Sequence, residues 1–242
     1  MPKNSADSLE KQKVLFPIRE KMAATPTVPQ AWLLSPRLTI ACLIGATILG
    51  LLARMNENPL QPLDDAVRDL FYLHDSEQVA WFSRLFLSSP GNVMSGIGLG
   101  VLFTLLLLRS GHRASALAYV VALLLTWLAS VSLKLMVGRP RPDFGIEMAT
   151  LAWPSGHTML ATVLWGMLLF AVLPRLTKSG GSLTNMLETR MATRIWLCIV
   201  VVTACARMLA GVHWISDVIG GAMIGILILQ FALRLEQHLL GR

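Results

Sequence analysis

The chain has 242 residues, of which 54% are hydrophobic and only 14% are charged. Soluble domains carry about 25% charged residues, so this composition, together with long apolar runs, indicates a membrane protein. The formal net charge of +7 does not indicate nucleic-acid binding, because no basic patch interleaved with aromatic residues accompanies it. The cysteines lie inside apolar runs without metal-type spacing, so they indicate neither a disulfide framework nor a zinc site. They are Cys42, Cys198 and Cys205.

Residues 1–36 form a polar, basic stretch with several prolines. Such a segment has too few apolar residues to bury a core, so we expect a flexible cytoplasmic tail there. The first apolar run begins too deep in the chain for a secretory signal peptide, and no small-residue cleavage site follows it. We expect residues 37–242 to form one domain, because the sequence contains no internal repeat and no low-complexity segment.

Six apolar runs follow the tail, and each is predicted to become a helix that crosses a membrane. Their approximate limits are 38–53, 93–108, 114–137, 158–173, 195–209 and 215–233. A spanning helix needs about 17–25 residues, so several runs reach that length only with flanking residues. One run alone would also suit a soluble core, but six in one chain indicate a membrane bundle. The predicted fold is an all-α membrane protein with a bundle of six transmembrane helices.

The stretch between the first two runs, residues 56–90, mixes apolar and charged residues. This pattern predicts one or two amphipathic helices that lie at the membrane interface rather than across it. Four tryptophans are also expected at the interface, where tryptophan is enriched in membrane proteins. They are Trp32, Trp81, Trp153 and Trp214.

Three short polar stretches lie at the ends of apolar runs, at residues 134–142, 154–157 and 207–217. Ionisable groups that close to a bilayer are costly, so they are candidates for a functional site. The basic residues of the loops predict on which side these stretches lie. Alternate connections and both termini hold 14 of the 21 lysines and arginines. By the positive-inside rule both termini are cytoplasmic, which places all three polar stretches on the extracytoplasmic face.

The third stretch contains a histidine and a carboxylate at helical spacing. His213 and Asp217 are four residues apart, so on a helix that begins at His213 they share one face. A carboxylate there can hold the imidazole in one tautomer and leave the other nitrogen free to attack an electrophile. The alternative is a purely structural histidine at a helix start, paired with a capping aspartate.

The second stretch reads Pro-Ser-Gly-His and precedes an apolar helix. Ser155 suits the N-cap of that helix, and Gly156 would let an anion approach the backbone N–H groups at the helix start. His157 adds a proton donor beside that position. The alternative is a capped helix with no ligand.

The first stretch supplies cations. Lys134 lies at the end of the third run, and Arg141 follows in a turn made by glycine and prolines. Arginine presents a fork that matches phosphate oxygens, and lysine presents a point charge. For Arg139 we expect a simpler role, in which the side chain reaches toward lipid headgroups.

The spacing across the three stretches is specific as a set. A lysine precedes an Arg-Pro pair in the first stretch, Pro-Ser-Gly-His forms the second, and arginine, histidine and aspartate follow in the third. This order resembles the type 2 phosphatidic acid phosphatase (PAP2) family of integral-membrane lipid phosphatases, which is related to the vanadium haloperoxidases. The resemblance covers about residues 56–233, including the six-helix layout. It implies catalysis through a phosphohistidine intermediate.

The resemblance also implies a role for each matching residue. The implied nucleophile, general acid and orienting carboxylate are His213, His157 and Asp217. The implied phosphate ligands are Lys134, Arg141, Arg207, Ser155 and Gly156. One position departs from the family pattern, because Ala206 stands where a serine usually precedes the third-stretch arginine. Weaker or altered phosphate binding is the expected consequence.

Elementary chemistry agrees with these roles. Phosphoryl transfer needs positive charge around the equatorial oxygens and reacting groups in line on either side of phosphorus. Three cations with helix-start amides would supply the charge, and two histidines would supply the nucleophile and the proton donor. No carboxylate cluster suits Mg²⁺ or Zn²⁺, so we expect a metal-independent reaction with no cofactor.

The sequence thus predicts a lipid phosphatase of the bacterial cytoplasmic (inner) membrane that acts at the extracytoplasmic face. Its partners would be the bilayer and a lipid phosphate or diphosphate. Undecaprenyl diphosphate is favoured on family frequency alone, with phosphatidylglycerol phosphate and lipid A phosphate as the other candidates. A lipid phosphotransferase, a non-catalytic lipid-phosphate-binding protein and a haloperoxidase are the alternatives. The oligomeric state stays open.

Overall fold

The computed structural model describes residues 32–71, 77–142, 150–176 and 182–241. All regular secondary structure in these residues is helical. The tail expected over residues 1–36 lies mostly outside the described residues. Its last part is packed, since the Leu33 side chain is fully buried and its carbonyl oxygen accepts a hydrogen bond from Gln230.

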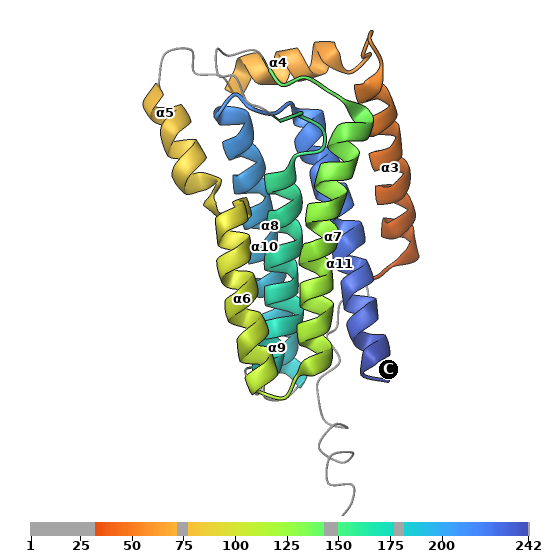
Figure 1. The fold of residues 1–242 in the computed structure, drawn as a ribbon, viewed down its shortest axis with the longest axis vertical. Coiled ribbons are helices and arrows are strands. Elements are labelled where there is room, and N and C mark those ends of the chain that lie inside the picture. The colour runs from red at the N-terminus through yellow and green to blue at the C-terminus, as the bar shows by residue number, and fades with distance from the viewer. Residues whose placement is uncertain (1–31, 72–76, 143–149, 177–181, 242) are drawn as a thin grey trace, which may run out of the picture.

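The long helices run along one bundle (Figure 1). They are α3 (Pro36–Arg54), α6 (Val93–Arg109), α7 (Arg113–Val137), α8 (Gly156–Met167), α10 (Ser182–Leu209) and α11 (Ile215–Leu239). The shorter elements are α4 (Gln61–Phe71), α5 (Glu77–Phe82), η1 (Ser83–Leu87), η2 (Ser89–Gly91), η3 (Leu168–Val172) and α9 (Leu173–Leu176). Five of the six predicted apolar runs fall within one helix each, and the run 158–173 extends through α8 and η3 into α9.

Five helical segments in the described residues are long and apolar enough to cross a membrane. They are 36–54, 113–137, 156–176, 189–209 and 215–239. The sixth apolar helix, α6, has 17 residues and is shorter than the others. Between α3 and α6 the chain makes the two additional helices that the mixed stretch predicted, and α4 lies across one end of the bundle (Figure 1). The C-terminal end of α11 lies at the opposite end.

Helix α8 lies inside the bundle, where it packs against α6, α7, α10 and α11. Small residues let α11 approach it closely. A Cβ atom on Gly221 would lie 2.6 Å from the carbonyl oxygen of Ser155, and one on Gly225 would lie 2.7 Å from Cβ of Thr162. Helix pairs in membranes use small residues in this way, because close backbone contact replaces the hydrophobic effect as the driving force. The start of α8 is thereby held against the start of α11.

Local sequence ends the helices that lead to the site. Gly138 follows α7 with φ of 71°, and Gly211 follows α10 with φ of 66°. Both angles lie in the left-handed region that glycine adopts without strain, which is the usual C-terminal cap. After Gly211, helix α11 begins at Ile215, two residues later than His213. The expectation that His213 begins this helix is wrong, because the Trp214 N–H is capped by the Asp217 carboxylate at 2.9 Å.

Candidate active site

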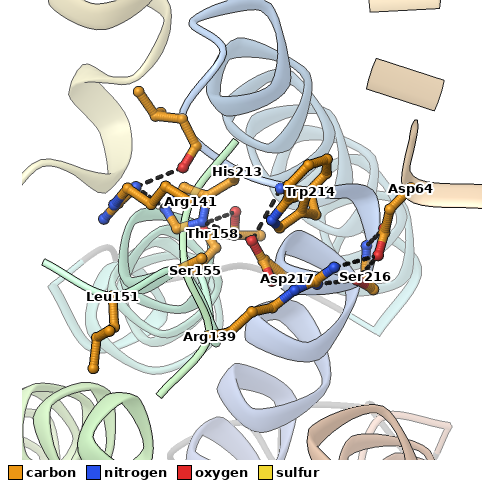
Figure 2. Close-up of polar contacts among 12 residues, drawn as sticks. Asp64, Arg139, Arg141, Leu151, Ser155, Thr158, His213, Trp214, Ser216 and Asp217 are labelled. Carbon is orange, nitrogen blue, oxygen red and sulfur yellow. Dashed lines mark hydrogen bonds and ion pairs between the residues drawn. The ribbon is translucent and has the colours of Figure 1, made fainter. Parts of the chain in front are cut away.

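The three polar stretches meet at the end of the bundle where α4 lies. The residues that follow α7, the start of α8 and the turn between α10 and α11 approach one another there (Figure 2). Three hydrogen bonds to backbone carbonyl oxygens join them. Ala152 N donates to Arg139 O at 2.8 Å, Ser155 N donates to Asp217 O at 3.0 Å, and the Trp214 indole donates to Pro140 O at 3.2 Å. Segments distant in sequence therefore form one compact polar centre.

His213 lies between a carboxylate and a guanidinium. Its Nδ1 is 3.3 Å from Asp217 Oδ2, and its Nε2 is 3.1 Å from Arg141 Nη1. The carboxylate oxygen can only accept and the guanidinium can only donate. Nδ1 therefore carries the proton, and the lone pair of Nε2 faces Arg141. Both neighbours select the same neutral tautomer, whose free nitrogen points toward the cations (Figure 2).

The charge state of His213 follows from its surroundings. Its side chain is 1% exposed. Burial, and then the positive charges of Arg141, Arg207 and Lys134, lower the pKa of His213 well below the usual histidine range. Both causes disfavour the imidazolium. The imidazole is therefore neutral at neutral pH, as a nitrogen nucleophile needs to be.

Asp217 uses both carboxylate oxygens. Oδ2 faces His213 and accepts from Trp214 N, while Oδ1 accepts from Arg139 Nη1 at 2.9 Å. The side chain is fully buried. This set of donors fixes the carboxylate at the first turn of α11, where the helix dipole also favours a negative charge.

The cations of the site are anchored by neighbouring backbone groups. Arg141 donates from Nε to Thr150 O at 2.7 Å and from Nη1 to Val212 O at 2.6 Å. Lys134 Nζ donates to the carbonyl oxygens of Leu151 and Ala152. These contacts orient the charges before any ligand binds, and preorganised charge is the main source of stabilisation for phosphoryl groups.

The Pro-Ser-Gly-His stretch divides into two parts. Ser155 is the N-cap residue of α8, as predicted, but its side chain makes no capping bond and its Oγ accepts from Thr158 Oγ1 at 3.1 Å. The Ser155 hydroxyl is buried within the protein and does not line the cavity described below. Gly156 and His157 do line it. A Cβ atom on Gly156 would lie 2.8 Å from Ser130 Oγ, so a larger residue would clash with α7.

A cavity of about 680 Å³ begins at this polar centre and extends between α6, α7 and α8. Its polar end contains the site residues His157, His213, Lys134, Arg141 and Arg207. The rest of the wall is formed largely by apolar side chains. They include Val93, Ile97, Val101, Leu105, Val120, Leu123, Leu124, Trp127 and Leu160. The structure therefore brings six of the eight predicted site residues, Gly156 among them, to one cavity.

Arg139 does not reach toward lipid headgroups, contrary to the expectation. Its side chain is 3% exposed and donates to Asp64 Oδ2 at 2.6 Å as well as to Asp217. The guanidinium can be buried because it is paired and hydrogen-bonded to the Asp64 and Asp217 carboxylates. The sequence offered no signal for Asp64, which lies 75 residues before Arg139 on α4.

Of the four tryptophans expected at the membrane interface, Trp32 and Trp81 are exposed, but Trp153 and Trp214 are buried in the protein and do not face lipid. They are 3% and 7% exposed. Trp153 packs against Gly50 and Gly220, and the ring of Trp214 lies 5.2 Å from the guanidinium carbon of Arg139. Glycines on two helices leave room for the first indole, and a cation–π contact accompanies burial of the second.

Metal ligands are scarce around this centre. Within the described ranges, no group of three or more histidine, cysteine, aspartate or glutamate side chains is placed to hold a metal ion. The cavity lining contains three cations and two imidazoles, which suit an anion.

Comparison with known proteins agrees with this geometry. Phosphatidylglycerophosphatase B from Bacillus subtilis (strain 168) is 31% identical over 101 residues, which is 40% of this chain and 45% of the relative. The match thus spans less than half of that protein. The crystal structure of a transmembrane PAP2-type phosphatidylglycerolphosphate phosphatase from Bacillus subtilis superposes with a TM-score of 0.66. It shares 23% identity and the alignment covers 80% of this chain and 93% of that one, which shows a common fold.

The family follows from the part of the chain that carries the motifs. The model of the PAP2 superfamily matches residues 115–239, which include all three polar stretches and the helices between them. This span is more than half of the chain. The protein belongs to the PAP2 superfamily.

Proposed function

We propose that this protein is a membrane lipid phosphatase that removes phosphate through a phosphohistidine formed on His213. One observation carries the proposal. The unprotonated Nε2 of a neutral His213 lies at the polar end of a cavity that also contains Lys134, Arg141, Arg207 and His157. Three cations can neutralise a phosphate group, and its phosphorus would then lie beside the nucleophile.

The reaction has two balanced steps. In the first, the Nε2 lone pair of His213 attacks phosphorus, a P–N bond forms, and the P–O bond to the lipid breaks. The leaving oxygen takes a proton from protonated His157 and departs as the lipid alcohol, which leaves His157 neutral for the second step. In the second step, water attacks phosphorus while His157 accepts its proton, and the P–N bond breaks to release inorganic phosphate. Asp217 keeps the Nδ1 proton of His213 in place and compensates the positive charge of the phosphorylated ring.

The shape of the cavity favours a lipid substrate. The charged end is small, and the much longer apolar wall between α6 and α7 suits hydrocarbon chains. Phosphatidylglycerol phosphate is our first candidate, because a relative with 31% identity is named as a phosphatidylglycerophosphatase. This choice replaces the preference for undecaprenyl diphosphate, which rested on family frequency. Undecaprenyl diphosphate and lipid A phosphate remain in the substrate panel.

The test is phosphate release by the purified protein in detergent, with each lipid in turn and with EDTA present. We expect release from phosphatidylglycerol phosphate that is unaffected by EDTA and is lost in His213→Ala. Trapping of ³²P on the wild-type protein, stable to base and labile to acid, would identify the phosphohistidine. Loss of activity with EDTA and recovery with a divalent ion would contradict the cation-based site. Label passed to a lipid alcohol instead of water would make the protein a transferase.

We further propose that α6 is a sixth membrane span of a protein in the bacterial inner membrane, with both termini cytoplasmic. At 1.5 Å per residue the 17 residues of α6 extend about 25 Å, close to the thickness of a bilayer core of about 30 Å. The site end would then be extracytoplasmic. A C-terminal green fluorescent protein fusion is expected to fluoresce, and a C-terminal alkaline phosphatase fusion is expected to be inactive. The reverse pattern would overturn this topology.

A further inference from the structure

Behind Asp217, on the side away from His213, one arginine is held between two buried carboxylates (Figure 2). Arg139 donates from Nη1 to Asp217 Oδ1 at 2.9 Å and from Nη2 to Asp64 Oδ2 at 2.6 Å. All three side chains are almost entirely buried. Gln61 Oε1 accepts a further bond from Arg139 Nη2 at 3.1 Å. The interfacial helix α4 is therefore connected to the orienting carboxylate through two side-chain contacts.

Asp64 also caps α11 from a different part of the chain. Its Oδ1 accepts from Ser216 N at 3.0 Å, and its Oδ2 accepts from Ser216 Oγ at 2.7 Å. Ser216 is the second residue of α11, whose N–H has no partner within its own helix. The carboxylate satisfies that N–H and complements the positive end of the helix dipole. Asp64 thus fixes the turn that carries Asp217.

The charges of this cluster have a defined sum. Arg139 alone would neutralise Asp217 and weaken the attraction between that carboxylate and a cationic imidazole. Asp64 binds the other half of the guanidinium, so the three groups together have a net charge of −1. The imidazole becomes positive when its Nε2 is phosphorylated while Nδ1 keeps its proton. A net negative charge behind Asp217 therefore stabilises the intermediate.

We propose that Asp64 and Arg139 are positioning residues, which fix Asp217 and leave one net negative charge behind it for phosphorylation of His213. This inference rests on the proposed function, since it concerns the same imidazole. The two fail in different ways. If the wild-type protein shows no His213-dependent phosphate release, the proposed function fails, whereas an active enzyme that is insensitive to these charges refutes only the positioning role.

Other charges near His213 stay constant in the test. The groups that face the imidazole are Lys134, Arg141, Arg207, His157 and Asp217. On α4 the charged neighbours of Asp64 are Asp65, Arg68 and Asp69, of which Arg68 pairs with the other two. The variants below change only the charges behind Asp217, and they alter neither the groups that face His213 nor the charged neighbours of Asp64 on α4.

The first variant is Asp64→Asn, which removes the charge and keeps an oxygen that can accept from Ser216. We expect kcat to fall about 10- to 100-fold with KM within about twofold, because the lost stabilisation appears only when the imidazole is charged. Removing a negative charge lowers the pKa of His213 further, so the acid limb of kcat/KM moves to lower pH. Asp69→Asn is the matched control. It lies on the same helix with an exposed carboxylate paired to Arg68, and it is expected to change neither value.

The second variant, Arg139→Gln, removes the positive charge and is expected to move the acid limb upward by about one pH unit. The double variant Asp64→Asn with Arg139→Gln restores the net charge of −1 and is expected to return the limb toward its wild-type position. A purely structural network would instead give losses of activity and thermal stability that accumulate in the double variant, with no movement of the limb.

A milder third variant covers the case in which either of these proteins does not fold. Gln61→Glu adds a negative charge 3.1 Å from Arg139 without removing a partner of Ser216. It is expected to move the acid limb upward, opposite in direction to Asp64→Asn. The proposal is overturned if the folded variants have a wild-type acid limb, or if Asp64→Asn and Gln61→Glu move it in the same direction.

Discussion

Two buried ionic clusters lie at opposite ends of the bundle, and they differ in charge balance. At the end away from α4, Arg175 pairs with Glu236 at 3.2 Å, and Ser115 donates a short hydrogen bond to the same carboxylate. One positive charge meets one negative charge. At the α4 end, two carboxylates meet four cations among the described residues. These groups are Asp64, Asp217, Lys134, Arg139, Arg141 and Arg207.

The difference separates a stabilising contact from a ligand site. A buried charge is costly unless it is paired and hydrogen-bonded, so an excess of cations raises the free energy of the empty site. A phosphate group would remove that excess, and a cavity lies beside it. The pair of Glu236 and Arg175 has no excess of positive charge that a ligand would neutralise. We therefore expect substitutions at the two ends to affect different measurements, catalysis at one and stability at the other.

The largest contrast should come from two histidines. His213→Ala removes the nucleophile and is expected to lower kcat at least about 10⁴-fold. The control is His238→Ala, an exposed histidine near the C-terminal end of α11, which is expected to keep wild-type turnover. Phosphate release in matched detergent preparations measures both. Residual turnover of His213→Ala within about tenfold of wild type would refute the nucleophile assignment.

Arg141→Ala is expected to lower kcat/KM by about 10²- to 10³-fold, because it removes a preorganised donor from the developing negative charge. Arg141→Lys keeps a charge but loses the fork that also holds Thr150 and Val212, so an intermediate value is expected. The control is Arg113→Ala, an exposed arginine at the other end of α7. Equal activity of the alanine and lysine variants would show that the charge of Arg141 contributes nothing.

The pH dependence sharpens the same contrast. Only neutral His213 attacks and only protonated His157 donates to the leaving oxygen, so kcat/KM rises as pH increases through the pKa of His213 and falls at higher pH as His157 loses its proton. Burial and the neighbouring cations lower the pKa of His213 well below the usual histidine range. The acid limb is therefore expected below pH of about 6.5, the ordinary histidine value. A pH profile taken with correction for substrate ionisation measures it, and a limb near pH 7 or above would contradict a neutral, cation-surrounded His213.

The opposite cluster should respond in stability alone. Glu236→Gln leaves Arg175 buried without its counter-charge, which costs about 3 kcal/mol. We expect a lower Tm in detergent with kcat unchanged within about twofold. Combining it with Arg175→Gln should recover part of the lost Tm, since the double variant holds no unpaired charge. A large fall in kcat at wild-type Tm would mean that the two ends are coupled.

The smallest effect is expected at Ala206. Its side chain is fully buried and does not line the cavity. A serine there would have its hydroxyl inside the helix packing, so Ala206→Ser should change KM for the lipid by less than about threefold. The alternative expectation, that the alanine weakens phosphate binding, predicts a clear decrease in KM on restoring serine.

Much of the fold was predictable because apolar length and helix-ending residues act locally. All six apolar runs became helices, and Gly138 and Gly211 end two of them where the sequence indicated. The meeting of the three polar stretches was predictable from the loop charges. The ends of the helices were less predictable. Helix α10 begins at Ser182, which is 13 residues before the start of the predicted run at residue 195. Polar helical residues outside the apolar segment give no hydropathy signal.

The sequence by itself determined which residues could do chemistry here, because the order and spacing of His157, Arg207, His213 and Asp217 are local properties of the chain. Only the tertiary structure decided how the charges pair. Asp64 lies 75 residues from Arg139 and 152 from Ser216, and no local pattern relates them. The pairing exists because α4 folds across the start of α11, where a carboxylate, a guanidinium and a helix end lower one another's cost of burial. The packing of helices decides which charged residues pair when they lie this far apart in the sequence, and hydrophobic periodicity gives no information about such pairs.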